Sequence, residues 1–159
     1  MKIKILCVGK IKEKYLRDAI AEYSKRLTRY CKLEFQEVPD EKTPDGASEA
    51  EELRVKDIEG KRLLSVIRDT DYVIALAIEG QMPDSIGLAR RIDQLGIQGQ
   101  SSICFVIGGS LGLSEDVMNR ADEQISFSRL TFPHQLMRVI LLEQIYRSFR
   151  IIHGEPYHK

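Results

Sequence analysis

The segment that decides the fold runs from Ile103 to Phe149 and reads ICFVIGGSLGLSEDVMNRADEQISFSRLTFPHQLMRVILLEQIYRSF. Its first apolar run, Ile103–Ile107, predicts a buried strand that stops at Gly108-Gly109. Ser114 is followed by two acidic residues, a pattern that predicts the start of a helix. The serine hydroxyl can cap the free backbone amides there, and the acids suit the positive end of the helix dipole.

The same segment predicts a second strand at Ile125–Ser128 and a long helix from about His134 to Ile152. Pro133 can occupy the first turn of that helix, where its missing N–H is no loss. Ligands of α/β proteins collect at the carboxyl ends of strands, and this segment supplies two such ends.

The rest of the chain alternates between strand and helix patterns, which predicts an α/β fold with a mostly parallel sheet flanked by helices, in one domain over residues 1–159. Further strands are expected at Lys2–Val8, between Leu33 and Val38, and at Tyr72–Ala77. Further helices are expected at Lys12–Tyr30, from a Ser48 cap onward, and from Asp84 or Ser85 to Leu95. We also expect Gly60 to interrupt the second helix, and Glu79-Gly80 to turn the chain.

The final predicted helix is apolar on all sides at Val139–Leu142, and Ile145 continues the pattern. A helix of this kind must be buried on more than one side. Near the end of a small chain, this favours contact with a second subunit.

The net charge and its distribution limit the functions that the chain can have. The chain has 159 residues and a formal net charge of zero, so it is not a general binder of nucleic acid. The charge is unevenly distributed, however, with ten Lys/Arg against three Asp/Glu in residues 1–32 and nine acids against three bases in residues 37–59. A local basic face and ordinary solvated helix faces both explain this pattern.

The three cysteines, Cys7, Cys31 and Cys104, are far apart and lie in apolar or strand-like settings. We expect them to be buried reduced thiols, which suits the cytoplasm. No Cys-x-x-Cys or His pair occurs, so no metal site is expected. No run approaches the roughly 20 apolar residues of a membrane span, and the charged start does not read as a signal peptide.

Two segments are candidate binding sites. The Gly108–Gly112 turn lacks the Gly-x-Gly-x-x-Gly and Walker spacings, so it is either a plain tight turn or a turn that holds a nucleoside-like ligand through backbone groups. A valine at position 108 would then block the ligand without altering the fold. Phe127–Phe132 is either part of that site or an apolar loop packed on the final helix.

Arginines and the last residues supply two further candidates. Arg147 lies nine residues after Arg138, which is about 180° around a helix, so the two cannot form one patch on a single helix. These two and Arg150 are either scattered solvated charges or residues that a dimer brings together. By composition, the residues from Gly154 to Lys159 are typical of a disordered chain terminus. However, Pro156 stiffens them, and Tyr157 and His158 are types used in stacking and proton transfer.

Four motifs together resemble the ribosomal large-subunit RNA methyltransferase H family of the SPOUT class. They are FVIGGSLG at 105–112, SRLTFPH at 128–134, EQIYR at 143–147 and PYH at 156–158. The resemblance covers the whole chain. It implies a C-terminal trefoil knot, a homodimer, and S-adenosyl-L-methionine as methyl donor. The implied reaction is N3-methylation of a pseudouridine in 23S rRNA of the assembled 70S ribosome, with no role for DNA or membrane.

The resemblance also implies site residues. The expected donor-binding residues are Leu76, Gly108, Phe127, Ser128, Arg129, Leu130, Thr131 and Phe132. The expected catalytic residues are His158, Tyr157 and Arg147, with His134 a weaker candidate. His158 is expected to act as general base or to orient the nucleobase, Tyr157 to stack on or hydrogen-bond it, and Arg147 to pair with phosphate or with developing negative charge. Two alternatives stay open: a SPOUT enzyme that modifies tRNA or another rRNA position, and a ribosome-associated protein that binds a nucleoside without turnover.

Overall fold

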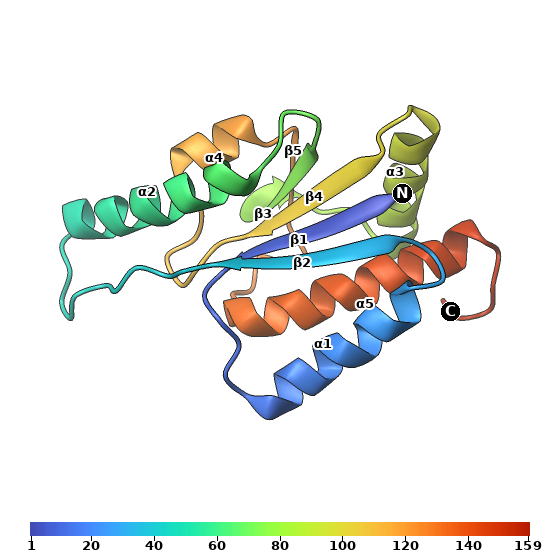
Figure 1. The fold of residues 1–159 in the computed structure, drawn as a ribbon, viewed down its shortest axis with the longest axis horizontal. Helices are drawn as coiled ribbons and strands as arrows, with labels where there is room; N and C mark the ends of the chain where they lie inside the picture. Colours follow the sequence, from blue (N-terminus) through green and yellow to red (C-terminus); the bar gives the residue numbers. More distant parts are fainter.

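The computed structural model describes all residues from Met1 to Lys159, and it contains one five-stranded sheet with helices on both faces (Figure 1). The strands are β1 (Lys2–Val8), β2 (Lys32–Val38), β3 (Tyr72–Gln81), β4 (Ser102–Ile107) and β5 (Glu123–Ile125). The helices are α1 (Lys14–Leu27), α2 (Glu49–Val66), α3 (Ser85–Ile97), α4 (Glu115–Arg120) and α5 (His134–Ile152). The strand order is β2-β1-β4-β3-β5 and every pair is parallel, so the predicted α/β class with a mostly parallel sheet is confirmed.

Alternation along the strands divides the core into two layers. Ile3 and Ile5 of β1 face a cluster formed with α1, α3 and α5, whereas Leu6 and Val8 face a smaller cluster formed with α2 and α4. Successive side chains of a strand point to opposite faces, so one strand serves both layers. This explains why the buried strands read as continuous apolar runs.

Helix α5 lies between α1 and α3 on one face of the sheet (Figure 1). Leu141, Leu142 and Ile145 are fully buried within the chain itself, whereas Val139 and Ile140 are only half-buried. The all-round apolar character of this helix is therefore explained largely by its neighbours in the same chain. It does not by itself require a second subunit.

The capping predictions are confirmed. Ser48 and Glu51 form a reciprocal capping box at the start of α2, Asp84 accepts from the Gly87 amide at 2.7 Å, and Ser114 accepts from the Val117 amide at 3.3 Å. Pro133 is the residue just before α5 rather than its first helical residue. Helix α1 is shorter at both ends than the predicted Lys12–Tyr30.

Two glycine predictions are wrong, for the same physical reason. Gly60 does not interrupt α2, and the strand does not turn at Glu79-Gly80 but continues to Gln81. A Cβ at Gly60 would lie 2.2 Å from Ser114 Oγ, and one at Gly80 would lie 2.7 Å from the backbone of β5. These glycines allow elements distant in sequence to approach closely, which sequence spacing does not reveal.

Strand β5 covers Glu123–Ile125, not the predicted Ile125–Ser128. Its partner decides the boundary, because Glu123 pairs with Ile74 and Ile125 pairs with Leu76 of β3. A bulge then brings Gln81 back to Ile125. Acidic residues have low strand propensity, so the apolar pattern placed this strand too late.

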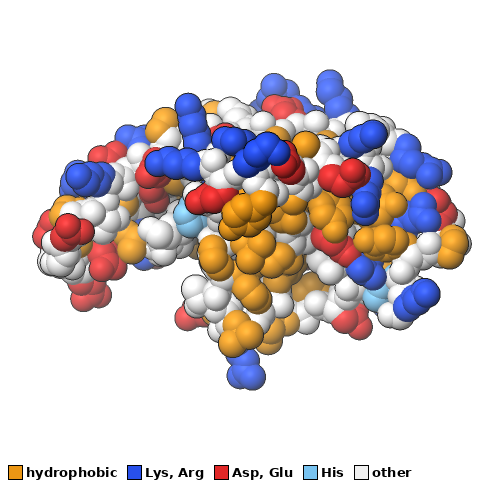
Figure 2. Space-filling model, turned by 90° about the horizontal axis from the view of Figure 1, so that it is seen from below, with side chains coloured by type: hydrophobic (Ala, Val, Ile, Leu, Met, Phe, Trp, Pro, Cys, Tyr) orange, Lys and Arg blue, Asp and Glu red, His pale blue; other side chains and the backbone are white.

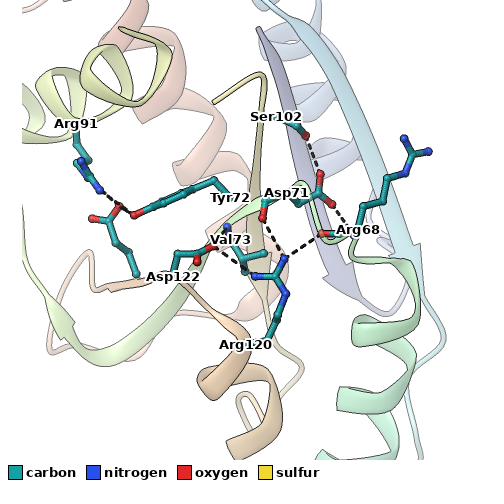
Figure 3. A network of polar contacts seen from close by, with 9 residues as sticks. Arg68, Asp71, Tyr72, Val73, Arg91, Ser102, Arg120 and Asp122 are labelled. Carbon is teal, nitrogen blue, oxygen red and sulfur yellow. Dashed lines mark hydrogen bonds and ion pairs between the residues drawn. The ribbon is translucent and has the colours of Figure 1, made fainter. Parts of the chain in front are cut away.

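A network of hydrogen bonds lies at the amino-terminal ends of the strands (Figure 3). Arg120 donates to the backbone carbonyls of Arg68 and Asp71 at 3.0 and 3.1 Å, and the Asp71 carboxylate accepts from the Ser102 hydroxyl at 2.9 Å. The network ties α4 to the connection between α2 and β3. It lies at the end of the strands opposite to the candidate site.

None of the five helices combines the length and the apolar composition needed to cross a membrane.

Candidate functional site

A cavity of about 720 Å³ opens at the carboxyl ends of β3, β4 and β5. Residues of three segments line it, 76–78, 107–112 and 125–137. Within the third segment, residues 129, 135 and 136 do not line the cavity. Helix α4 leaves β4 toward one face of the sheet, whereas α3 and α5 follow their strands on the other face. Diverging connections of this kind create the crevice in which α/β proteins bind ligands, and the volume lies within the usual range of roughly 300–1,000 Å³.

Seven of the eight predicted donor-binding residues line this cavity. They are Leu76, Gly108, Phe127, Ser128, Leu130, Thr131 and Phe132. Arg129 is exposed and does not line it. The two segments that sequence spacing singled out separately, the glycine turn and the 127–132 loop, thus form opposite walls of one cavity.

The 127–132 loop is held in shape by its own hydroxyls. Ser126 Oγ donates to the Ser128 carbonyl at 2.9 Å, and the Leu130 amide donates to Ser128 Oγ at 2.9 Å. Phe127 packs against the core layer that contains α5, whereas Leu130 is 71% exposed at the cavity mouth. Phe127 thus anchors the loop to the core, as the packing interpretation predicted, and Ser128, Leu130, Thr131 and Phe132 line the cavity.

Gly108 is required by the turn itself. A Cβ at this position would lie 2.7 Å from the carbonyl carbon of Gly112 and 2.8 Å from its oxygen. The turn folds back onto the end of β4 so closely that no side chain fits. The expectation that Gly108→Val leaves the fold largely intact is therefore wrong, and its effect on ligand binding stays a prediction.

The cavity wall is mostly apolar and carries little charge. Apart from His134, no acidic or basic side chain lines the cavity, and its polar groups are hydroxyls and backbone. Burial lowers the pKa of His134, and the charge of Arg138 lowers it further, while Asp40 acts in the opposite direction.

His134 also lines a second cavity of about 540 Å³ at the carboxyl ends of β1 and β2. This cavity is polar, with Lys10, Lys12 and Glu59 among its lining residues. The Nδ1 atom of His134 is buried and has no hydrogen-bond partner in the chain. His134 therefore lies where the apolar and the polar cavity adjoin.

Arg138 is a fully buried structural residue. Its guanidinium donates to Glu37 at 2.7 Å and to the carbonyls of Val8 and Gly9 at 2.7 and 3.0 Å, which pins the ends of β1 and β2 to α5. The interpretation of the three arginines as scattered solvated charges is thus wrong, and Arg138 is separate from the other two.

The three predicted catalytic residues lie together at the far end of α5. Arg147 Nη1 is 3.1 Å from His158 Nδ1, and the Arg147 guanidinium carbon is 4.8 Å from the centre of the Tyr157 ring. Burial raises the pKa of the Tyr157 hydroxyl, as does the Glu143 carboxylate, while Arg147 and Arg26 act in the opposite direction.

The last residues are folded against the protein, contrary to the prediction from composition. Arg150 donates to Glu155 at 2.7 Å and to the Pro156 carbonyl at 3.0 Å, and Tyr30 donates to Glu155 at 2.9 Å. The Tyr157 ring packs edge-on against Tyr146. These contacts hold Tyr157 and His158 in place beside Arg147.

Two contributors to this cluster escaped the sequence analysis. Glu143 accepts from Arg147 Nε at 3.0 Å, and its second oxygen is buried without a partner. Tyr23 and Arg26 of helix α1, and Tyr30 just after it, pack against Tyr146 and so also adjoin the cluster. The apolar pattern of α1 had marked the two tyrosines as core, and only tertiary packing shows that they adjoin the tail.

The cavity and the Arg–Tyr–His cluster lie at opposite ends of α5. His134 opens this helix and Arg147 follows 13 residues later, which corresponds to about 20 Å at 1.5 Å per residue. Within one chain, the predicted donor and acceptor residues therefore do not form one site.

The family comparison identifies the class. A family model described as predicted SPOUT methyltransferase matches residues 1–158. The chain therefore belongs to the SPOUT methyltransferase family, and the predicted resemblance to this class is confirmed.

Individual relatives are similar over their full length. A protein of Clostridium novyi (strain NT) is 61% identical over 159 residues and one of Enterococcus faecalis (strain ATCC 700802 / V583) is 59% identical, with all of each chain covered. Both are named ribosomal RNA large subunit methyltransferase H. Among solved structures, a probable methylase family protein from Haemophilus influenzae Rd KW20 aligns with a TM-score of 0.56 at 10% identity, covering 99% of this chain and 70% of that one. That likeness concerns the fold alone.

Proposed function

We propose that this protein is a single-domain enzyme of the cytoplasm, spanning residues 1–159, that methylates N3 of a pseudouridine in 23S rRNA of the assembled 70S ribosome. The observation that carries the proposal is full-length identity of about 60% to proteins named ribosomal RNA large subunit methyltransferase H. The uncharged cavity at the strand ends and the distant Arg–Tyr–His cluster supply the two kinds of site that such a reaction needs.

The cavity is proposed to hold S-adenosyl-L-methionine, which supplies an electrophilic methyl group on a sulfonium. The glycine turn and the hydroxyls of the opposite loop would orient the adenosine part. Apolar residues such as Leu76 and Leu130 would exclude water from the sulfonium. In an in-line methyl transfer, positioning of this kind provides much of the catalysis.

The Arg147–Tyr157–His158 cluster is proposed to hold the nucleobase. Tyr157 offers a ring for stacking on the base, and His158 offers a ring nitrogen for a hydrogen bond. The N3 proton of the base must pass to solvent water or to a ring nitrogen of His158 as the methyl group arrives. Arg147 would stabilise the negative charge that this loss creates.

A homodimer would bring the two sites together, since they are about 20 Å apart along α5 within one chain. Two exposed apolar side chains, Ile78 and Leu130, line the cavity, and Met82 and Ile86 are exposed after the end of β3 and at the start of α3. Figure 2 shows hydrophobic side chains gathered across the middle of the face below the sheet. We propose that a second copy covers the exposed residues beside the cavity and that its tail reaches over the cavity of the first. The trefoil knot stays a prediction from the family resemblance.

Mass-spectrometric mapping of rRNA tests the reaction. Deletion of the gene should remove one methyl group from a pseudouridine of 23S rRNA, and the purified protein should restore it on 70S ribosomes. Methylation of tRNA, or of another rRNA position, would support the alternative SPOUT enzyme. Binding of the donor by calorimetry without any methyl transfer would support the non-enzymatic alternative.

Mixed dimers test the shared site. One subunit carries Thr131→Arg, which fills the cavity from an exposed lining position, and the other lacks residues 157–159. Each variant alone should be inactive, whereas the mixed dimer should retain one working site. An inactive mixed dimer, with both subunits folded and paired, would mean that each site is built from one chain.

A further inference from the structure

An aromatic and basic surface joins the end of α1 to the end of α5. Tyr146 is surrounded by three tyrosines, with ring centres at 6.4 Å for Tyr23, 6.1 Å for Tyr30 and 5.0 Å for Tyr157. The guanidinium of Arg26 lies over two of these rings, 5.2 Å from the Tyr23 centre and 5.7 Å from the Tyr146 centre. Arg26 and Tyr157 thus pack against the same ring.

The arginines of this surface differ in how many of their N–H groups are free to donate a hydrogen bond to a ligand. Arg147 uses its Nε and both terminal nitrogens on Glu143 and His158. Arg150 uses its two terminal nitrogens on Tyr30, Glu155 and Pro156, and its Nε is buried. Both side chains are therefore engaged in holding the tail.

Two guanidinium groups beside the tail have free donors, Arg26 and Arg29, and Arg26 is the one that packs on the Tyr146 ring beside Tyr157. Its Nε donates to Glu22 at 3.2 Å, and neither terminal nitrogen makes a hydrogen bond within the chain. Its side chain is 41% exposed, and its terminal nitrogens keep four N–H groups without a partner in the chain. The two rings beneath it restrict its motion, which reduces the entropy lost when it binds a ligand.

We propose that Arg26 binds a phosphate of the RNA strand next to the target nucleotide, and that the surface around it guides that strand toward Tyr157 and His158. This deepens the proposed function and rests on it. The phosphate contact assigned to Arg147 from the family resemblance thereby passes to Arg26.

Charge on this surface favours an RNA backbone as partner. Lys25 and Arg26 lie in the last turn of α1 and Arg29 follows just after it, and Arg29 is 65% exposed with its only acidic partner at 3.7 Å. Aromatic rings interleaved with arginines are typical of surfaces that bind single-stranded nucleic acid. A planar guanidinium with two free terminal nitrogens matches a phosphate in bidentate geometry. A chain of zero net charge can thus still present one basic path to RNA.

The test measures ribosome methylation by wild-type and Arg26→Gln protein at several salt concentrations. We expect Arg26→Gln to raise the KM for ribosomes about tenfold with little change in kcat. The slope of log(kcat/KM) against log[salt] should become shallower by about 0.7–1, the value of one lost phosphate contact. Affinity for S-adenosylmethionine alone should not change.

Two matched controls separate phosphate binding from a structural role. Arg17→Gln removes an exposed arginine nine residues earlier on α1, about 180° around the helix, and should leave KM and slope unchanged. Glu22→Gln removes the same intrahelical ion pair while keeping the Arg26 charge, so it should leave the slope unchanged. An equal loss in Glu22→Gln would overturn the inference, as would an Arg26→Gln enzyme with wild-type KM and slope. If wild-type protein transfers no methyl group at all, the proposed function fails instead.

Discussion

Arg147 and His158 are joined by a contact of 3.1 Å between Nη1 of the guanidinium and Nδ1 of the imidazole. A guanidinium has no acceptor, so Nδ1 must accept this hydrogen bond and the neutral ring carries its proton on Nε2. In this arrangement Nε2 is a donor. The geometry favours a His158 that orients the nucleobase through Nε2–H over one that removes the N3 proton.

Substitution at His158 tests this role. His158→Ala should lower kcat about 100-fold or more, whereas His158→Gln should retain about ten times the activity of the alanine variant, because its amide can donate from a position near Nε2. Single-turnover methylation of ribosomes measures both. Equal inactivity of the two variants would instead indicate a general base, which glutamine cannot replace.

A pair of leucines tests the donor cavity. Leu130 is 71% exposed and lines the cavity, whereas Leu53 is 50% exposed on α2, on the other face of the sheet. Leu130→Ala should weaken S-adenosylmethionine binding about tenfold, because it removes an apolar contact worth about 1.5 kcal/mol. Leu53→Ala should have no effect in the same calorimetric titration. Unchanged affinity in Leu130→Ala would place the donor elsewhere.

Gly108 should be a stability position as much as a binding position. Gly108→Ala places a Cβ against the Gly112 backbone, so we expect a loss of about 2 kcal/mol in the free energy of unfolding, together with lost donor binding. Gly96→Ala is the control, since the nearest atom to its Cβ is the flexible end of Met1. Chemical denaturation measures both. An unchanged midpoint for Gly108→Ala would show that the turn can relax.

The proposed dimer can be disrupted at its apolar surface. Leu136 is 36% exposed near the start of α5, unlike Leu141, which is fully buried and would unfold the chain if charged. Leu136→Glu should yield folded monomers without methylation activity, and Leu53→Glu should stay dimeric. Light scattering and circular dichroism decide between these outcomes. An active Leu136→Glu monomer would contradict the shared site.

The cysteines should be unreactive in the native protein. Burial raises the pKa of Cys7 and Cys104 to about 12 and that of Cys31 to about 11. At pH 8 only about one Cys7 thiol in 10⁴ is then a thiolate, the reactive form. Labelling with a thiol reagent should be slow until the protein is unfolded, when three groups should react. Rapid labelling of the folded protein would contradict the burial.

Local pattern was enough to predict much of the architecture. Helix α5 and strand β1 have the predicted bounds, and the Ser48, Asp84 and Ser114 caps form as expected, because each depends on residues within one turn. The α/β class followed from the alternation of strand and helix patterns. The short motifs also carried the family resemblance, since each motif occupies a few consecutive residues.

Tertiary structure decided everything that depends on contacts distant in sequence. The bounds of β5 follow from pairing with β3, and Gly60 and Gly80 are required by the close approach of elements distant in sequence, which no spacing reveals. The tail is held in place by Arg150 and Tyr30, which are more than 100 residues apart in sequence. Hydrophobic periodicity records which face of an element is buried, but it does not record what that face is buried against. For the same reason Arg26, an ordinary charged residue of α1 in the sequence, is recognisable as a neighbour of Tyr157 only in the folded chain.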